Sequence, residues 1–199
     1  PSNTGSESEL VLVISDELWL GKAGDIISDV LQENIRAIPQ QEALFSIYNI
    51  EAKDFSSIYK THKNILWISI SEKEAFERTD QMWSKDQLYI RLSNTTEEAL
   101  INNIKDHIYT IRSLFLDKDQ QRRLQKLKTS SDKEMQKLIQ RSYELSITVP
   151  GGYQIASTED NFIWLRRDRP KVNVVSNIWI YSEAYNSPEQ FNKQYLMAL

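Results

Sequence analysis

The stretch that decides the fold runs from Leu145 to Tyr181 and reads LSITVPGGYQIASTEDNFIWLRRDRPKVNVVSNIWIY. Its first residues alternate between apolar and polar, with Leu145, Ile147 and Val149 on one side, which is the period-two pattern of a strand with one buried face. Pro150-Gly151-Gly152 then predicts a tight reversal, because proline has no N–H for a ladder and glycine accepts positive φ. We therefore expect a strand over 145–149.

Three more β-rich runs follow, at Tyr153–Ser157, Phe162–Leu165 and Val172–Tyr181. Phe162–Leu165 is apolar on both faces and lies between two polar turns, so we expect it to be an interior strand. Four strands joined by short turns predict an antiparallel meander.

A helix is expected after the meander. Ser187-Pro188-Glu189 is typical of a helix start, and Phe191, Tyr195 and Leu199 then fall on one stripe that would cover one face of the sheet. A meander with one covering helix still leaves a sheet edge and a sheet face without partners. We therefore expect an unpaired edge or an exposed apolar patch beside Val172–Tyr181, and a natural protein that continues past Leu199.

The preceding chain alternates strand and helix. Strands are expected at Leu10–Ile14, Leu44–Ile50, Asn64–Ile70 and Gln87–Leu92, which predicts an α/β sheet with right-handed crossovers. A long helical passage follows from Asn94 to Arg141, as two helices or one bent helix. The expected fold class is α/β (α+β), with a flexible leader over 1–9, an α/β domain over 10–141, and an antiparallel sheet packed by helices over 142–199.

Composition narrows the class of protein. The chain has 199 residues, 40% of them hydrophobic, which is enough for a core without covalent staples. It has no Cys, which excludes disulfides and thiolate chemistry, and no apolar run of about 20 residues that could span a bilayer. The net charge of −4 argues against nucleic-acid binding. The polar leader is typical either of a segment left after signal removal or of a shortened chain.

Candidate catalytic groups are few. His62 and His107 have no second His or Cys near them, and there is no GxGxxG, GK[ST] or GxSxG motif, so we expect no metal site and no cofactor. Asp16 and Glu17, with Trp19 beside them, follow the first strand, where open α/β sheets often bind ligands. The same two acidic residues are also explained if they cap the helix that follows, without any ligand.

Basic residues offer a second type of site. The passage Lys118–Arg141 holds eight basic and three acidic side chains, so its local charge of +5 leaves −9 on the rest of the chain. Arg122, Arg123 and Lys126 could therefore dock on anionic lipid or on an acidic partner, or could simply be solvated. Here Arg122, Arg123, Lys126 and Lys137 are expected to be exposed, and Leu124, Leu127, Leu138 and Ile139 buried. Arg166 and Arg167 could form an anion clamp, or solubilise a strand end.

Four segments carry a family resemblance. VLVISDELW with GKAGD (11–19 and 21–25), IPQQEALFSI (38–47), KNILWI (63–68) and YELSITVPGGYQI with NFIWLRRD (143–155 and 161–168) resemble a family of uncharacterised Bacteroidota lipoproteins catalogued as a domain of unknown function. The resemblance implies a removed signal peptide, a lipidated Cys just before residue 1, and a location at the cell envelope, in the periplasm or on the outer membrane. It implies no catalytic residues.

The turn Val149-Pro150-Gly151-Gly152-Tyr153 is also similar, over a shorter length, to PsbP-like sandwich folds, which serve mostly as non-catalytic assembly or binding modules. The sequence thus favours a binding or assembly module of an envelope lipoprotein, held by an N-terminal lipid and facing another envelope protein or an anionic lipid surface. The alternative is an envelope hydrolase that uses acidic residues such as Asp16 and Glu17. Convergent carboxylates of raised pKa in a deep pocket would favour the hydrolase.

Overall fold

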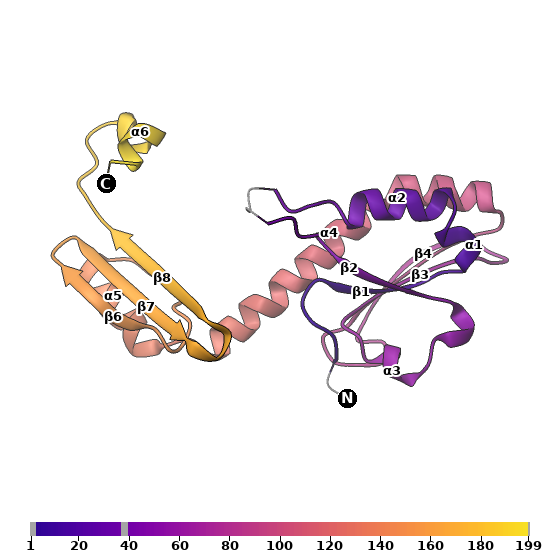
Figure 1. Ribbon diagram of the computed structural model, residues 1–199, viewed down its shortest axis with the longest axis horizontal. Coiled ribbons are helices and arrows are strands. Elements are labelled where there is room, and N and C mark those ends of the chain that lie inside the picture. Colours follow the sequence, from indigo (N-terminus) through magenta and orange to yellow (C-terminus); the bar gives the residue numbers. More distant parts are fainter. Residues whose placement is uncertain (1–2, 37–39, 199) are drawn as a thin grey trace. The chain divides into compact units, whose positions relative to one another are not determined.

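The computed structural model describes residues 3–36 and 40–198, in two compact units, Pro1–Arg123 (unit 1) and Leu124–Leu199 (unit 2) (Figure 1). The sequence expectations that involve Ile38, Pro39 and Leu199 lie outside the described residues. The α+β fold class is confirmed, since unit 1 carries a mostly parallel sheet and unit 2 an antiparallel one. The division between Arg123 and Leu124 falls within one continuous helix.

Unit 1 is built on a five-stranded sheet in the order β2-β1-β3-β5-β4. Four strands run parallel, and β4 is an antiparallel edge strand. The sequence analysis missed β4, because most of its side chains are exposed and AFERTD shows no apolar pattern. The strands are β1 (Glu9–Val13), β2 (Ser46–Ile50), β3 (Asn64–Ile70), β4 (Ala75–Asp80) and β5 (Leu88–Asn94).

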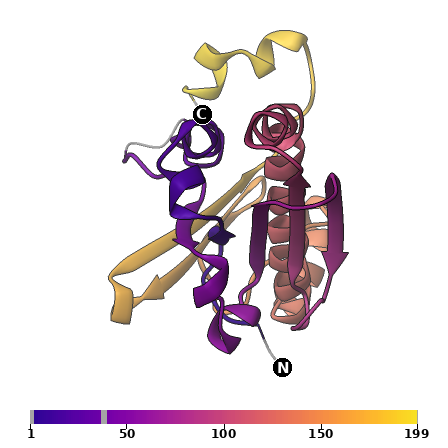
Figure 2. The same ribbon diagram turned by 90° about the vertical axis from the view of Figure 1, so that its right-hand side faces the viewer.

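Helices cover one face of this sheet. The four-residue α1 (Asp16–Trp19) leads into α2 (Lys22–Leu31), and α4 (Glu97–Thr129) lies next to α2, as the nearly end-on view of Figure 2 shows. Apolar stripes of both helices bury the same side of β1, β3 and β5. The run LVLVI is buried on both faces because the opposite face of the sheet is also covered.

The opposite face carries a smaller aromatic cluster. Val11, Val13, Ile65 and Tyr89 are buried there beneath partly buried side chains that include Phe55 and Trp83. Phe55 directly follows the short helix η1 (Ala52–Asp54), Tyr59 lies in α3 (Ser57–Lys60), and Trp83 lies in the β4–β5 turn region. Phe55 meets Trp67 edge-on at 5.3 Å, a favoured aromatic geometry.

The N-terminal segment, expected to be a flexible leader, is paired with unit 1 in its described part. Thr4 N donates to Thr61 O at 2.7 Å, Lys63 N donates to Thr4 O at 3.2 Å, and Asn3 Nδ2 donates to Lys85 O at 3.0 Å. Residues 3–8 therefore run along the end of the sheet before β1 begins at Glu9.

The long helical passage is two helices. α4 ends at Thr129 and α5 begins at Lys133 and ends at Tyr143. The N-cap of α5 is Asp132, whose Oδ1 accepts a hydrogen bond from Met135 N at 3.0 Å. Asp132 therefore sets where α5 starts.

Unit 2 contains a three-stranded antiparallel sheet in the order β6-β7-β8, with α5 behind it in Figure 1. The prediction that Phe162–Leu165 lies in an interior strand is confirmed, since β7 pairs with both neighbours. Ile163 and Leu165 of β7 are fully buried with Ile139 of α5. The strands are β6 (Gln154–Glu159), β7 (Phe162–Arg169) and β8 (Val174–Tyr181), with η2 (Pro170–Val172) between the last two.

The fourth strand, expected over 145–149, is absent, so this part of the prediction is wrong. The segment leaves α5 through Glu144 in a left-handed conformation, and Val149 O accepts from Asp132 N at the start of that helix. Ile147 and Val149 still pack on the core of unit 2. The alternating sequence pattern therefore reflects side chains that alternately face the core beside a helix. Such burial does not require the hydrogen-bond ladder of a β-sheet.

The C-terminal covering helix is also a wrong prediction. Asn192 is extended (φ −79°, ψ 156°) and caps Tyr195 N, so it divides the region into η3 (Pro188–Phe191) and α6 (Lys193–Leu196). Phe191 is 73% exposed and covers no sheet face. An asparagine whose side chain caps a helix also ends the one before it.

Candidate functional site

The outer face of the three-stranded sheet, the face opposite α5, is an open surface that carries aromatic side chains. Trp179 is 68% exposed there, and Val175 and Tyr181 are exposed beside it along β8. The pairing of β7 with β8 places Trp164 opposite Trp179 and Phe162 opposite Tyr181, on the same face. The patch expected beside Val172–Tyr181 is therefore confirmed, and β8 is an edge strand among the described residues.

Strand alternation explains why these aromatics are uncovered. Ile163, Leu165 and their partners Ile178 and Ile180 turn toward α5, so the residues between them must turn outward. On the outer face Trp164 Nε1 donates a hydrogen bond to Asn177 Oδ1 at 2.9 Å, and this bond orients the Trp164 ring. We call the set Phe162, Trp164, Val175, Trp179 and Tyr181 the aromatic face.

Arg166 and Arg167, expected as a clamp, lie on opposite faces. Arg166 is on the outer face, where its Nε is 2.9 Å from Asp168 Oδ1. Arg167 stacks over the ring of Tyr153 at 4.7 Å, and its Nη1 lies 3.4 Å from the Gly151 carbonyl. Neighbouring strand residues cannot share a face, so one anion cannot be held by both side chains on the sheet.

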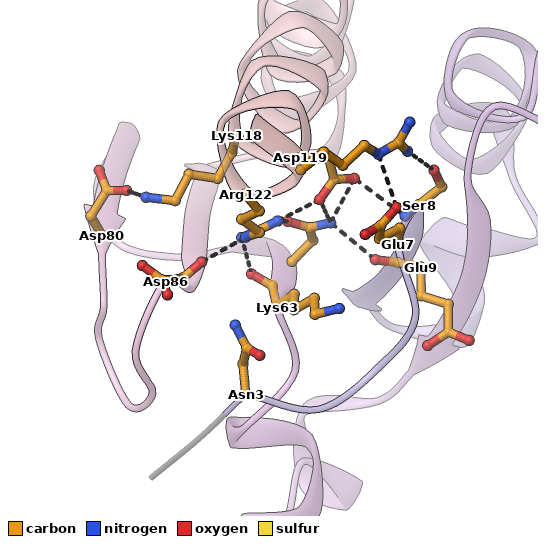
Figure 3. A network of polar contacts seen from close by, with 12 residues as sticks. Asn3, Glu7, Ser8, Glu9, Lys63, Asp80, Asp86, Lys118, Asp119 and Arg122 are labelled. Atoms are coloured by element: carbon orange, nitrogen blue, oxygen red, sulfur yellow. Dashed lines mark hydrogen bonds and ion pairs between the residues drawn. The ribbon is translucent and has the colours of Figure 1, made fainter. Parts of the chain in front are cut away.

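Arg122, expected to be exposed, is instead part of a buried network at the end of the unit 1 sheet (Figure 3). Its side chain is 11% exposed and pairs with the Asp119 carboxylate, which is 3% exposed. Its Nη1 donates to Asn64 Oδ1 at 2.8 Å, its Nε to Asp86 O at 2.8 Å, and its Nη2 to Lys63 O at 2.9 Å. A guanidinium with five donors suits such a junction of α4, β3 and the β4–β5 turn.

Asp119 completes this network. Its Oδ2 accepts from Ser8 N at 3.2 Å, and Asn64 Nδ2 reaches both the carboxylate and Glu9 O. Beside it Lys118 pairs with Asp80 of β4, which holds the pKa of that carboxyl below its usual range. The first turns of the basic passage therefore stabilise unit 1 and are not free for a partner.

The rest of the basic passage is mixed. Arg123, Lys126 and Lys137 are exposed and Ile139 is buried, as predicted, while Leu127 is partly buried. Leu124 and Leu138, predicted to be buried, are 46% and 40% exposed. Arg123 Nε forms an exposed ion pair of 3.0 Å with Glu7.

Asp16, Glu17 and Trp19 lie on α1, just past the carboxyl end of β1. Asp16 and Glu17 are exposed in its first turn, and Ser15 Oγ accepts from Leu18 N as the cap. Trp19 packs at the edge of the main core. A hollow of about 370 Å³ opens nearby between the ends of β1 and β3; its polar lining includes Ser15, Ser69, Glu51 and Lys53, and neither Asp16 nor Glu17.

Glu51 is the carboxylate in this hollow. It pairs with Lys53 and accepts from Asp16 N at 3.5 Å, which holds its pKa below the usual range. A general acid needs a raised pKa, and the one carboxylate that lines the hollow has the opposite shift. The arrangement gives no support to the hydrolase alternative.

The two histidines are separate. His62 is partly buried under the N-terminal segment, where burial lowers its pKa, and its Nδ1 has no hydrogen-bond partner among the described residues. His107 lies in α4 and packs against Phe76 at 4.4 Å. Within the described ranges no cluster of His, Asp or Glu is arranged to hold a metal, and no helix there is long and apolar enough to cross a membrane.

Fold and site together define a two-unit α+β protein whose small antiparallel sheet leaves one aromatic face open. The chain belongs to the family described as Domain of unknown function (DUF8532), which matches residues 3–128. Residues 131–199 match a second family, Domain of unknown function (DUF4837). The two matches meet between α4 and α5. No curated protein matches the chain. No solved structure matches it either.

Sequence reasoning foresaw the open patch but not the Arg122 network. The open patch was expected because a small sheet covered by one helix leaves a face and an edge without partners. Burial of Arg122 depends on Asn64 and Ser8, more than fifty residues away, and only the phase of Ile108, Ile111, Phe115 and Asp119 on α4 hints at it. Asp119 continues the apolar stripe of α4, and Arg122 follows it by three residues, on the same side of the helix. This spacing was the one sequence signal that could have predicted a buried ion pair.

Proposed function

We propose that this chain is a non-catalytic binding or assembly module and that the aromatic face of unit 2 is its contact surface. The single observation behind the proposal is that the two paired tryptophans and Tyr181 stand on an open sheet face beside an edge strand. Trp and Tyr are enriched in protein interfaces, where large rings add contact area at low entropy cost. Covering one such ring is worth roughly 1.5–3 kcal/mol.

The proposal extends to location and partner. The segments quoted above resemble Bacteroidota lipoproteins, and a module of that kind would be lipid-anchored through a Cys before residue 1 and would act in the cell envelope, at the periplasmic or outer-membrane surface. The partner of the aromatic face is then another envelope protein, with anionic lipid as the second choice. The PsbP-like turn at Pro150 supports a binding rather than a catalytic role by fold analogy alone.

Site-specific photo-crosslinking in cells tests this function. A photoreactive phenylalanine analogue replaces Trp179 in one variant and Tyr109 in another; Tyr109 is 65% exposed on α4 and serves as the matched control. We expect a discrete protein adduct from position 179 and none from position 109. A further Trp164→Ser change should abolish the adduct, since it removes half of the paired platform.

One outcome would overturn the function, and a second would overturn the choice of a protein partner. Identical adducts from positions 179 and 109 would mean that the aromatic face is not selective. A complete lack of protein adducts at 179, with crosslinks to lipid only, would leave the membrane and not a protein as the partner.

A further inference from the structure

A second surface of unit 2 lies on α5, away from the aromatic face. Lys133, Lys137 and Arg141 line a hollow of about 310 Å³ whose other wall is Ser146 and Ile147. These are residues of the segment that has a strand pattern and no strand partner. We propose that this groove binds an extended acidic peptide segment of a partner protein, which adds to 145–148 as a β-strand and places alternate carboxylates on the three cations. This site is independent of the aromatic face and goes beyond the proposed function.

The spacing of the cations carries the argument. Residues 133, 137 and 141 are four apart, so they lie on one face of α5 at steps of about 6 Å along its axis. In an extended peptide every second side chain points to the same face, at steps of about 6.6–6.8 Å. Three acidic residues at alternate positions therefore match three basic residues at every fourth helical position. Phosphate or a single carboxylate would use only one of them.

The backbone beside the helix is available for pairing. Among the described residues, the N–H and C=O groups of 145–148 make no backbone hydrogen bond, and the first pairing on this segment is Val149 O with Asp132 N. The segment must nevertheless be close to extended, because it runs from the end of α5 at Tyr143 back to Val149, whose carbonyl bonds Asp132 at the start of the same helix. Its Ser146 and Thr148 side chains are exposed. An open extended segment of this kind is the substrate for strand addition by a peptide.

Charge and hydrogen-bonding capacity in the groove favour an anion. Lys137 pairs with Glu134 at 2.8 Å, whereas Lys133 and Arg141 form no ion pair within the part of the chain that the structure describes. Gln136 also lines the groove, and its Nε2 is buried without an acceptor. A peptide carbonyl in the groove would satisfy that donor.

The binding test uses the full chain and a fluorescent hexapeptide of alternating glutamate and threonine with blocked ends. Fluorescence anisotropy should show binding that weakens as salt rises. Replacement of the three glutamates by lysine should abolish it. Binding to the triple variant Lys133→Glu, Lys137→Glu, Arg141→Glu should fall at least tenfold. The matched control is Arg169→Glu, Lys171→Glu, Lys193→Glu, which makes the same charge change on other exposed parts of unit 2 and should leave the affinity unchanged.

Strand addition has its own readout. Two peptides are made, one N-methylated at the backbone nitrogens of its glutamates and the other at those of its threonines. In a β-strand the backbone N–H groups of alternate residues point to the same neighbouring strand. Only one of the two methylated peptides should therefore lose affinity. Amide exchange at 145–148 should slow when the unmethylated peptide binds. This readout needs no substitution in the protein and so remains valid if the triple variant fails to fold.

Three results would overturn the inference. The first is no binding of the glutamate peptide at low salt, and the second is equal affinity of the two methylated peptides. The third is binding of the protein to vesicles of phosphatidylglycerol and phosphatidylcholine through the same three cations, without any binding of the peptide. The last would assign the basic stripe to a membrane surface. None of these results bears on the Trp179 crosslink, so the two proposals fail separately.

Discussion

Unit 1 and unit 2 use their polar and aromatic side chains in opposite ways. In unit 1, Arg122, Asp119 and Asn64 bond to one another and to the backbone at the end of the sheet, and both sheet faces are covered. In unit 2, one sheet face is packed on α5 and the other leaves Trp179 in solvent. Unit 1 carries 20 acidic and 14 basic residues, a net −6, and unit 2 carries 8 acidic and 10 basic, a net +2. The contrast teaches that a conspicuous cluster of charge contributes to a structural junction, while the open surface arises because the small sheet has a helix on one face only.

The largest effect is expected from Arg122→Met. It would leave Asp119 buried without its cation, which typically costs about 3–5 kcal/mol. Amide exchange of β3 reports the free energy of opening of unit 1. The neighbouring change Arg123→Met breaks an exposed ion pair and should cost less than about 1 kcal/mol. Similar losses for both variants would contradict the structural role of Arg122.

Unit 2 offers a comparison across a single sheet. Leu165→Ala should destabilise unit 2 by about 2–5 kcal/mol, because Leu165 is fully buried against α5. Trp179→Ser, on the other face, should change the free energy of unfolding by less than about 1 kcal/mol. Urea unfolding of each variant measures the difference. A large loss from Trp179→Ser would mean that the aromatic face stabilises the fold and is not spare surface.

A substitution at Gly24 tests how closely α2 packs against α1. A Cβ at Gly24 would lie 1.7 Å from the Trp19 carbonyl oxygen, so Gly24→Ala must push α2 away from α1. We expect a loss of about 1–3 kcal/mol in thermal or urea unfolding. At Gly21 the nearest atom would be 3.1 Å away, in an extended backbone conformation, so Gly21→Ala should cost clearly less. Equal costs at both glycines would show that α1 and α2 are not in close contact.

The smallest effect concerns pH. Burial lowers the pKa of His62, so the folded state binds its proton less readily than the unfolded state does. The stability that this histidine contributes is present above its unfolded pKa of about 6.5 and is lost as pH falls below that value toward the folded pKa. Opening of unit 1, followed by amide exchange at pH 7.5 and 5.5, should become easier at the lower pH, and less so in His62→Gln. An unchanged pH dependence in that variant would exclude His62 as the cause.

Local pattern predicted every strand of both sheets except β4, including β2, β6 and β8, which contain no fully buried residue. It failed where tertiary contacts override it: β4 has no apolar pattern, 145–149 has the pattern without a partner, and Asn192 divides a helix that the stripe of Phe191 and Tyr195 favoured. For the candidate sites the same limit applies. Exposure of Trp179 follows from alternation, but the split of Arg166 from Arg167 and the burial of Arg122 depend on partners distant in sequence.

The most direct test of the open aromatic face is carbene footprinting of Trp179 in the purified protein and in intact cells of the source organism. We expect heavy labelling of Trp179 in the purified protein and strong protection in the cells. Tyr109, exposed on α4, should be labelled to the same extent in both samples. Equal labelling of Trp179 in both samples would contradict the account, because a contact surface must be covered where its partner is present.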